Sequence, residues 1–189
     1  MTETSLAQRR LILVRHCEAS GQQPGAALTD AGLEQARELA EFLSGAPVDR
    51  IVASAYVRAQ QSIKPLAQRL GLPVHIDPRL NERNLSPRPV ANWREVLRDS
   101  FEDWDLRAPG GESAREVLVR GWECLNNLLN EGNQLPLVVT HGNLMSLVLH
   151  SLDPSFGYAG WLDLTNPDVY ALQSDANGGL VFRRIWRPG

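Results

Sequence analysis

Five residues suited to phosphoryl chemistry stand at or soon after the ends of predicted strands: Arg15, His16, Arg58, Glu82 and His141. Two guanidinium groups form a natural pocket for a dianion, most simply a phosphoryl group. A neutral imidazole can attack phosphorus, and a second imidazole can stabilise charge on the phosphoryl oxygens. A carboxylic acid can protonate the leaving oxygen and then, as carboxylate, accept a proton from water. Arginines and histidines supply the positive charge, so we expect no metal and no cofactor.

Apolar runs that alternate with helical patterns explain why these residues should meet. Strands are predicted over 11–14, 50–54, 73–77, 135–141, 169–174 and 180–186. Helices are predicted over 30–44, 56–70, 112–131 and 144–152. This alternation predicts an α/β fold, a three-layer α/β/α sandwich with a mostly parallel central sheet and an antiparallel edge strand. Such sheets bind ligands beyond the carboxyl ends of their strands, where the five residues fall.

The first predicted helix illustrates the pattern. Thr29 or Asp30 caps its start and Gly45 ends it. Its buried face is expected to consist of Leu33, Ala36, Leu39, Ala40 and Leu43. Pro65 is expected to kink the second helix.

One stretch fits the alternation poorly. Residues 84–109 contain Pro87, Pro89 and Trp93, followed by a charged, helix-like piece that ends near Trp104. We interpret this stretch as a lid-like excursion over the carboxyl edge of the sheet. With that exception, residues 1–189 are predicted to form a single domain.

Composition excludes several classes of function. A formal net charge of -3 argues against nucleic-acid binding, and no apolar run is long enough for a signal peptide or a membrane span. Two cysteines, Cys17 and Cys124, make neither a disulfide framework nor a zinc site. We therefore expect neither nucleic acid nor a membrane as partner, and a cytoplasmic location. The five residues described above indicate a small phosphorylated substrate. The oligomeric state does not follow from the sequence.

At its predicted site the sequence resembles the histidine phosphatases, the phosphoglycerate-mutase-like superfamily. The matching segments are VRHCEA, SAYVRAQQS, LNER, PGGES and VVTHGN, in family order over nearly the whole chain. The resemblance implies that His16 is the phosphorylated nucleophile and that Glu82 is proton donor and then base. It also implies that Arg15, Arg58 and His141 form the phosphate pocket.

The chain departs from the family pattern in the phosphate loop. Cys17 replaces the usual glycine, and Ala19 and Gln22 stand where many members have Ser and Asn. We still assign Gln22 to substrate binding, together with Gly142, whose missing side chain permits close backbone approach. Arg83 is a further candidate, either gripping a second anionic group of the substrate or facing solvent.

Alternatives remain for several residues. Glu112 rivals Glu82 as the proton donor, although it could equally cap the long helix; we favour Glu82. Thiol-phosphatase chemistry needs an arginine six positions after the cysteine, and Gln23 and Asn130 stand there instead. Cys124, His75 and His150 are expected to be structural or surface residues. Trp93 and Trp104 could line a substrate pocket.

These observations predict a phosphoric monoester hydrolase of the histidine acid type, acting on a small phosphorylated metabolite through a phosphohistidine intermediate. A phosphoglycerate mutase is the main alternative. The short chain offers no separate segment to shield the phosphohistidine from water, which favours hydrolysis. A non-catalytic relative that binds a phosphorylated ligand is a third hypothesis, but pure binding would not need an acid within reach.

Overall fold

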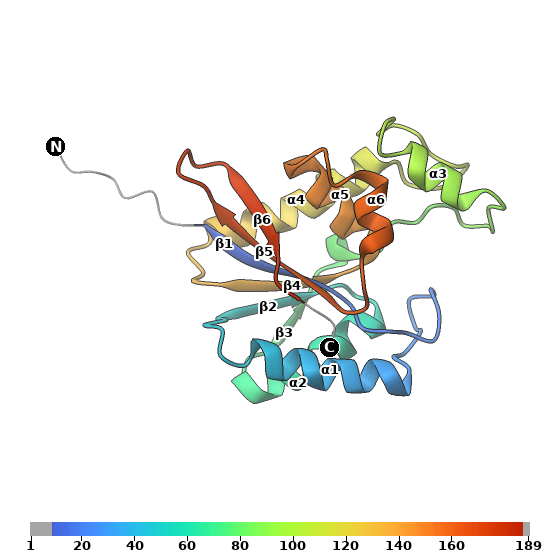
Figure 1. Ribbon diagram of the computed structural model, residues 1–189. Coiled ribbons are helices and arrows are strands. Elements are labelled where there is room, and N and C mark those ends of the chain that lie inside the picture. The colour runs from blue at the N-terminus through green and yellow to red at the C-terminus, as the bar shows by residue number, and fades with distance from the viewer. Residues whose placement is uncertain (1–8, 187–189) are drawn as a thin grey trace.

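The computed structural model describes residues 9–186 and consists of a six-stranded sheet covered by helices (Figure 1). The strands are β1 (Arg10–Arg15), β2 (Arg50–Ala53), β3 (Val74–Ile76), β4 (Pro136–Thr140), β5 (Asp168–Ser174) and β6 (Leu180–Arg184). The helices are α1 (Asp30–Leu43), α2 (Val57–Leu70), the 3₁₀ helix η1 (Pro78–Leu80), α3 (Trp93–Asp99), α4 (Ala114–Asn130), α5 (Gly142–Leu152) and α6 (Gly157–Asp163). No helix within this range is both long and apolar enough to cross a bilayer.

The sheet has the strand order β3-β2-β4-β1-β5-β6. The first four strands in this order are parallel to one another, whereas β5 and β6 run antiparallel to their neighbours. The predicted α/β fold with a mostly parallel sheet and an antiparallel edge is therefore confirmed.

Helices cover both faces of the sheet. In Figure 1, α1 and α2 lie on one side and α4, α5 and α6 on the other. The residues of β1 alternate between the two apolar layers, because Leu11 and Leu13 pack with α4 and α5 while Ile12 and Val14 pack with α1 and α2. A strand buried on both faces must be apolar at every position, which explains its unbroken run of aliphatic residues.

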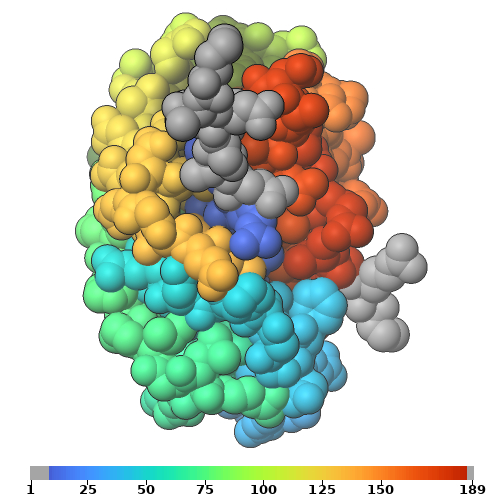
Figure 2. All heavy atoms as spheres, turned by 90° about the vertical axis from the view of Figure 1, so that its left-hand side faces the viewer, coloured from blue at the N-terminus to red at the C-terminus, as the bar shows by residue number. Residues whose placement is uncertain are grey.

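The strands begin and end at opposite edges of the sheet. Figure 2 views the edge at which β1 begins, where the β5–β6 turn and the connection leading into β4 lie. The carboxyl ends of β1, β2, β3 and β4 lie at the opposite edge, which is where the predicted site residues follow the strands.

The predicted core face of α1 needs one correction. Leu33 is 42% exposed, whereas Gly32 is buried together with the other predicted core residues. The reason is a close backbone approach: a Cβ on Gly32 would lie 2.0 Å from the carbonyl oxygen of Glu18. The first turn of α1 therefore touches the preceding loop through Gly32, and Leu33 turns toward solvent.

The region between β3 and α4 is anchored to the body of the protein. Leu97, Phe101 and Ala108 are buried, and the first two belong to the core layer that includes α4 and α5. The helix-like piece predicted in 84–109 is α3, which ends at Asp99 rather than near Trp104. The sequence analysis did not predict α6, and α2 continues as one helix through Pro65.

Candidate active site

The pairing of β1 with β4 brings two histidines together. Arg15 pairs in register with Thr140, and the His16 N–H continues the ladder by donating to the Thr140 carbonyl at 3.0 Å. The residue after each strand is a histidine, and the His16 and His141 rings meet edge to face with centroids 5.0 Å apart. The sheet register thus creates the pair.

His16 has a defined tautomer. Its Nδ1 lies 2.7 Å from the Cys17 carbonyl, which can only accept, so Nδ1 carries the proton. Its Nε2 accepts a hydrogen bond from Arg58 Nε at 3.1 Å. Burial lowers the pKa of His16 to about 3, and the charges of Arg58 and Arg15 add to that effect. The ring is therefore neutral near pH 7, with its lone pair on Nε2.

Arg58, in the first turn of α2, is completely buried. One of its terminal nitrogens donates to the carbonyls of Gln22 and Gln23 at 3.1 and 3.0 Å. The other, Nη2, is buried and has no hydrogen-bond partner within residues 9–186. The guanidinium also lies over the Tyr56 ring, 4.8 Å from its centroid. Arg58 is thus firmly oriented and keeps one unused donor group.

The Arg15 guanidinium is oriented by backbone carbonyls about 150 residues further along the sequence. Its Nη1 donates to the carbonyls of Leu164 and Thr165 at 3.0 and 3.3 Å. Its Nε is buried and has no partner in the described part of the protein. A Cβ on Gly142 would lie 3.3 Å from the guanidinium, so the missing side chain of Gly142 makes room for Arg15.

A chain of hydrogen bonds fixes the second histidine. The Ala55 N–H donates to Asn81 Oδ1, which therefore accepts from the Ser54 hydroxyl as well, each at 2.9 Å. With its proton so directed, Ser54 Oγ accepts from His141 Nε2 at 2.7 Å. Nδ1 of His141 is left buried and without a partner across residues 9–186. Burial, reinforced by the charges of nearby His16 and Arg58, lowers the pKa of His141 well below 6.5.

Three buried polar atoms with unused hydrogen-bonding capacity thus surround His16: Arg15 Nε, Arg58 Nη2 and His141 Nδ1. Leaving such atoms unpaired in the interior costs free energy, about 1–3 kcal/mol each and more for charged groups. An anion with several acceptor oxygens would satisfy the two guanidinium donors directly. It would also favour a proton on Nδ1 of His141, which could then donate as well.

Glu82 lies at the amino end of α5. Its carboxylate accepts from the backbone N–H groups of Asn143 and Leu144 at 3.1 and 3.3 Å, and from that of Arg83 at 2.8 Å. Burial lowers the pKa values of Arg15 and Arg58, and among the charges that oppose this effect the nearby Glu82 carboxylate is the largest. The structure therefore brings Glu82 to the two arginines.

Glu112 is placed differently. Both of its carboxylate oxygens accept from Arg120, at 2.9 and 3.0 Å, and one also accepts from the Asn84 N–H. The helix cap is Ser113, so Glu112 does not cap α4. This arrangement favours Glu82 over Glu112 as the carboxyl that serves the predicted phosphate pocket.

Arg83 has structural contacts, and no observation tests its predicted role in substrate binding. This residue is only 4% exposed, so it does not face solvent. Its guanidinium donates to Ser100 Oγ and to the carbonyls of Leu106 and Glu112, at 2.7 to 3.2 Å. Arg83 therefore fastens residues 84–109 to the loop that carries Glu82.

Gln22 contributes to the site through its backbone. Its carbonyl accepts from Arg58, while the residue itself is exposed. Whether the side chain reaches a bound substrate stays a prediction.

Sequence reasoning missed several supporting residues. The Asn166 side chain donates to the His16 carbonyl at 2.6 Å, next to the two carbonyls that hold Arg15. Nothing in the local pattern of residues 164–166 signals this contact, because it depends on β5 pairing with β1. Asn81 precedes Glu82 in LNER and could have been found from that motif.

The two cysteines and His150 lie in the interior of the protein. Cys17 and Cys124 are both buried and unbonded, and burial raises the pKa of each thiol to about 12. His150 packs against Phe101 and Trp104, with ring centroids 5.2 and 5.7 Å away. Trp93 is 38% exposed and meets Trp161 of α6 edge to face, and its role in lining a substrate pocket stays a prediction. Within residues 9–186 no group of three or more His, Cys, Asp or Glu side chains is arranged to hold a metal ion.

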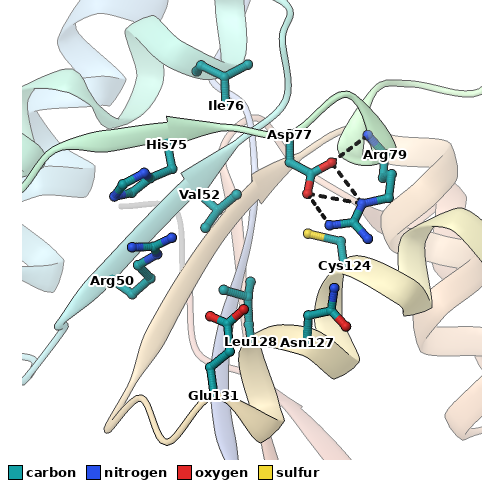
Figure 3. Close-up of a pocket in the computed structure, with 10 residues that line it drawn as sticks. All are labelled: Arg50, Val52, His75, Ile76, Asp77, Arg79, Cys124, Asn127, Leu128 and Glu131. Atoms are coloured by element: carbon teal, nitrogen blue, oxygen red, sulfur yellow. Dashed lines mark hydrogen bonds and ion pairs between the residues drawn. The ribbon is translucent and has the colours of Figure 1, made fainter.

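A pocket of about 250 Å³, separate from the predicted site residues, lies between β2, β3 and α4 (Figure 3). Arg50, His75 and Glu131 line it, and Asp77 and Arg79 form an ion pair at one side. Its lining includes none of the five predicted site residues.

Comparison with known proteins agrees with this geometry. The family model of the histidine phosphatase superfamily (branch 1) matches residues 11–184. The chain belongs to the histidine phosphatase superfamily. A probable phosphoglycerate mutase, GpmB, from Enterobacter sp. (strain 638) is 32% identical over 162 residues, which cover 76% of this chain and 74% of the relative.

Two solved histidine phosphatase structures are similar over nearly the full length. Mycobacterial glucosyl-3-phosphoglycerate phosphatase in complex with inorganic phosphate is 26% identical, with a TM-score of 0.73, covering 95% of this chain and 97% of that one. A putative alpha-ribazole-5'-P phosphatase from Escherichia coli K-12 is 25% identical, with a TM-score of 0.71, covering 93% and 94%.

Proposed function

We propose that this histidine phosphatase homologue is a metal-independent phosphomonoesterase that hydrolyses a small phosphorylated metabolite through a phosphohistidine on His16. The observation that carries the proposal is the orientation of His16. Its proton is fixed on Nδ1 and its lone pair on Nε2, beside the buried, partly unpaired guanidinium of Arg58.

The proposed first step transfers the phosphoryl group to the enzyme. Arg15, Arg58 and His141 bind the phosphoryl oxygens, and His16 Nε2 forms the P–N bond as the ester P–O bond breaks. Arg58 Nε releases Nε2 and donates to a phosphoryl oxygen instead. Glu82 gives its proton to the leaving alkoxide, so the alcohol departs neutral.

The proposed second step restores the enzyme. Water attacks phosphorus from the side vacated by the alcohol and loses a proton to the Glu82 carboxylate. The P–N bond breaks, His16 Nε2 regains its lone pair, and inorganic phosphate leaves. The sum of the two steps is one ester and one water converted to one alcohol and one phosphate.

Direct measurement of phosphate release tests the proposal. The panel contains p-nitrophenyl phosphate, 3-phosphoglycerate, glucosyl-3-phosphoglycerate and alpha-ribazole 5'-phosphate, each assayed with and without a chelator. We expect release from at least one compound, unchanged by the chelator, and an acid-labile, base-stable phosphoenzyme. Loss of activity in the chelator, or absence of the phosphoenzyme during turnover, would contradict the proposal.

A phosphoglycerate mutase is the second candidate, supported by the name of the relatives that are 30–32% identical. Supplied with 3-phosphoglycerate and catalytic bisphosphoglycerate, a mutase would isomerise faster than it releases phosphate. We expect the opposite ratio.

We also propose a cytoplasmic location, in keeping with two cysteines that are both free.

A further inference from the structure

An ion pair between Arg120 of α4 and Glu112, in the turn before α4, holds the loop that carries Glu82. Arg120, on the side of α4, donates through Nε and Nη2 to the two carboxylate oxygens of Glu112. This two-pronged geometry orients the guanidinium more strictly than a single contact does. The two side chains are only 19% and 30% exposed, so solvent screens them less than a surface pair.

The pair then grips the backbone on both sides of Glu82. Arg120 Nη1 donates to the carbonyls of Arg79 and Asn81 at 2.7 and 2.8 Å. Glu112 accepts from the Asn84 N–H at 2.9 Å, and its own N–H donates to the Asn84 carbonyl at 2.7 Å. The loop is therefore fixed before and after Glu82 by groups that belong to α4 and the turn preceding it.

The support itself is rigid. Ser113 and Glu116 form a reciprocal capping box at the start of α4. The turn before it is packed so closely that a Cβ on Gly111 would lie 2.0 Å from the Leu85 carbonyl. The backbone position of Glu82 thus depends on contacts with α4 and the turn before it, and not on the loop alone.

We propose that Glu112 and Arg120 are positioning residues that fix the Glu82 carboxyl for proton transfer, an inference that rests on the proposed function. Proton transfer requires the carboxyl within hydrogen-bond reach of the leaving oxygen, and a shift of about 1 Å can cost about 10²-fold in rate. Neither residue touches the substrate in this proposal.

The test compares two substrates with different needs for an acid. p-Nitrophenolate leaves readily without a proton, whereas the alkoxide of β-glycerophosphate does not. We expect R120M to lower kcat/KM for β-glycerophosphate by about 10- to 100-fold and that for p-nitrophenyl phosphate by less than about 3-fold. Equal losses for both substrates would overturn the proposal, because a general structural defect has no leaving-group preference.

The matched control is R115M on the same helix. Arg115 forms a comparable two-pronged pair with Asp105, but an exposed one, and it has no hydrogen bond to residues 79–84. We expect R115M to retain wild-type kcat/KM for both substrates. An equal substrate bias in R115M would also contradict a specific role for Arg120.

Two further variants keep the outcome decisive. In an E82Q background, R120M is expected to add less than about 3-fold for β-glycerophosphate, because the positioned proton is already gone; fully additive losses would refute the inference. E112Q should lose less than E82Q, and a larger loss would identify Glu112 as the proton donor. If R120M does not fold, as judged by its melting transition, R120K takes its place with the same substrate ratio.

Failure of the proposed function gives a separate result. The wild-type protein would then release phosphate from β-glycerophosphate and from every compound of the panel above at no measurable rate. A wild type active on β-glycerophosphate and p-nitrophenyl phosphate, with no substrate bias in R120M, would refute only the positioning role.

Discussion

The carboxyl edge of the sheet and the pocket beside β3 hold the same kinds of side chain, but these are partnered differently. The edge contains Arg58 and His141, both completely buried, each with a polar atom left unpaired within residues 9–186. The pocket contains arginines, a histidine, carboxylates and a cysteine; in the described chain Arg50 Nε is unpaired there too, but Arg79 donates to both oxygens of Asp77. The contrast teaches that residue types alone do not mark a phosphate site. The proposed phosphate site differs in having three such unpaired atoms among the described residues, two of them on arginines, around one buried histidine whose pKa burial lowers to about 3.

The largest expected effect separates the histidines of the two regions. H16A should lower kcat/KM by at least about 10³-fold and abolish the trapped phosphoenzyme, because no nucleophile remains. H75A, in the pocket, should retain both. Phosphate release is followed directly, and the phosphoenzyme is trapped by alkaline quench. A phosphoenzyme that persists in H16A would move the nucleophile to another residue.

The next effect separates the arginines. R58M should lower kcat/KM by about 10²–10³-fold, the usual loss when an oriented donor to a transition-state oxygen is removed. R50M is the matched control, since Arg50 Nε is also buried without a partner in the described chain but lines the pocket. Steady-state kinetics on p-nitrophenyl phosphate measure both variants. Similar losses in the two would erase the distinction between the regions.

A third prediction concerns stability against pH. His16 titrates at about pH 3 in the folded protein, because of burial first and then nearby positive charge, but near 6.5 when unfolded. Below pH 6.5 the unfolded chain binds a proton that the folded protein does not. The free energy of unfolding should therefore fall as pH drops toward 3, by up to about 1.4 kcal/mol per pH unit for this one histidine.

Urea unfolding at several pH values between 7 and 4 measures that slope. H16N should reduce it, and H141N should do the same, because burial also lowers the pKa of His141. A slope that is unchanged in both variants would show that the edge histidines are not held neutral.

The smallest effect compares the buried cysteine of each region. Burial raises the pKa values of Cys17 and Cys124 to about 12, so neither should react with a thiol reagent at pH 8 until the protein unfolds. C17A should keep activity within about 3-fold and lose roughly 1–2 kcal/mol of stability through the small cavity left behind. Rapid labelling of Cys17 in the folded protein would instead make its thiol part of an open site.

Local patterns predicted most of the fold and the five central residues of the site. Strand and helix periodicity is a property of short segments, so it can be read from the sequence. The carboxyl ends of parallel strands lie at the same edge of a sheet for any strand order. Leu33 was misassigned because a helix pattern cannot show which turn touches a distant backbone. The burial of Arg83 was not predicted because its partners, Ser100 and Leu106, lie in an irregular segment. Asn166 was missed because its contact with His16 depends on the pairing of β5 with β1, which no local pattern shows.

The place of β1 in the sheet sets a condition on biosynthesis. β1 is synthesised first, yet its neighbours β4 and β5 begin at Pro136 and Asp168. Closing such long loops is slow and exposes apolar strands meanwhile. The Arg15 guanidinium is oriented by the carbonyls of Leu164 and Thr165, which are also synthesised late. A nascent chain on the ribosome therefore carries every motif up to His141 before the proposed phosphate pocket can form.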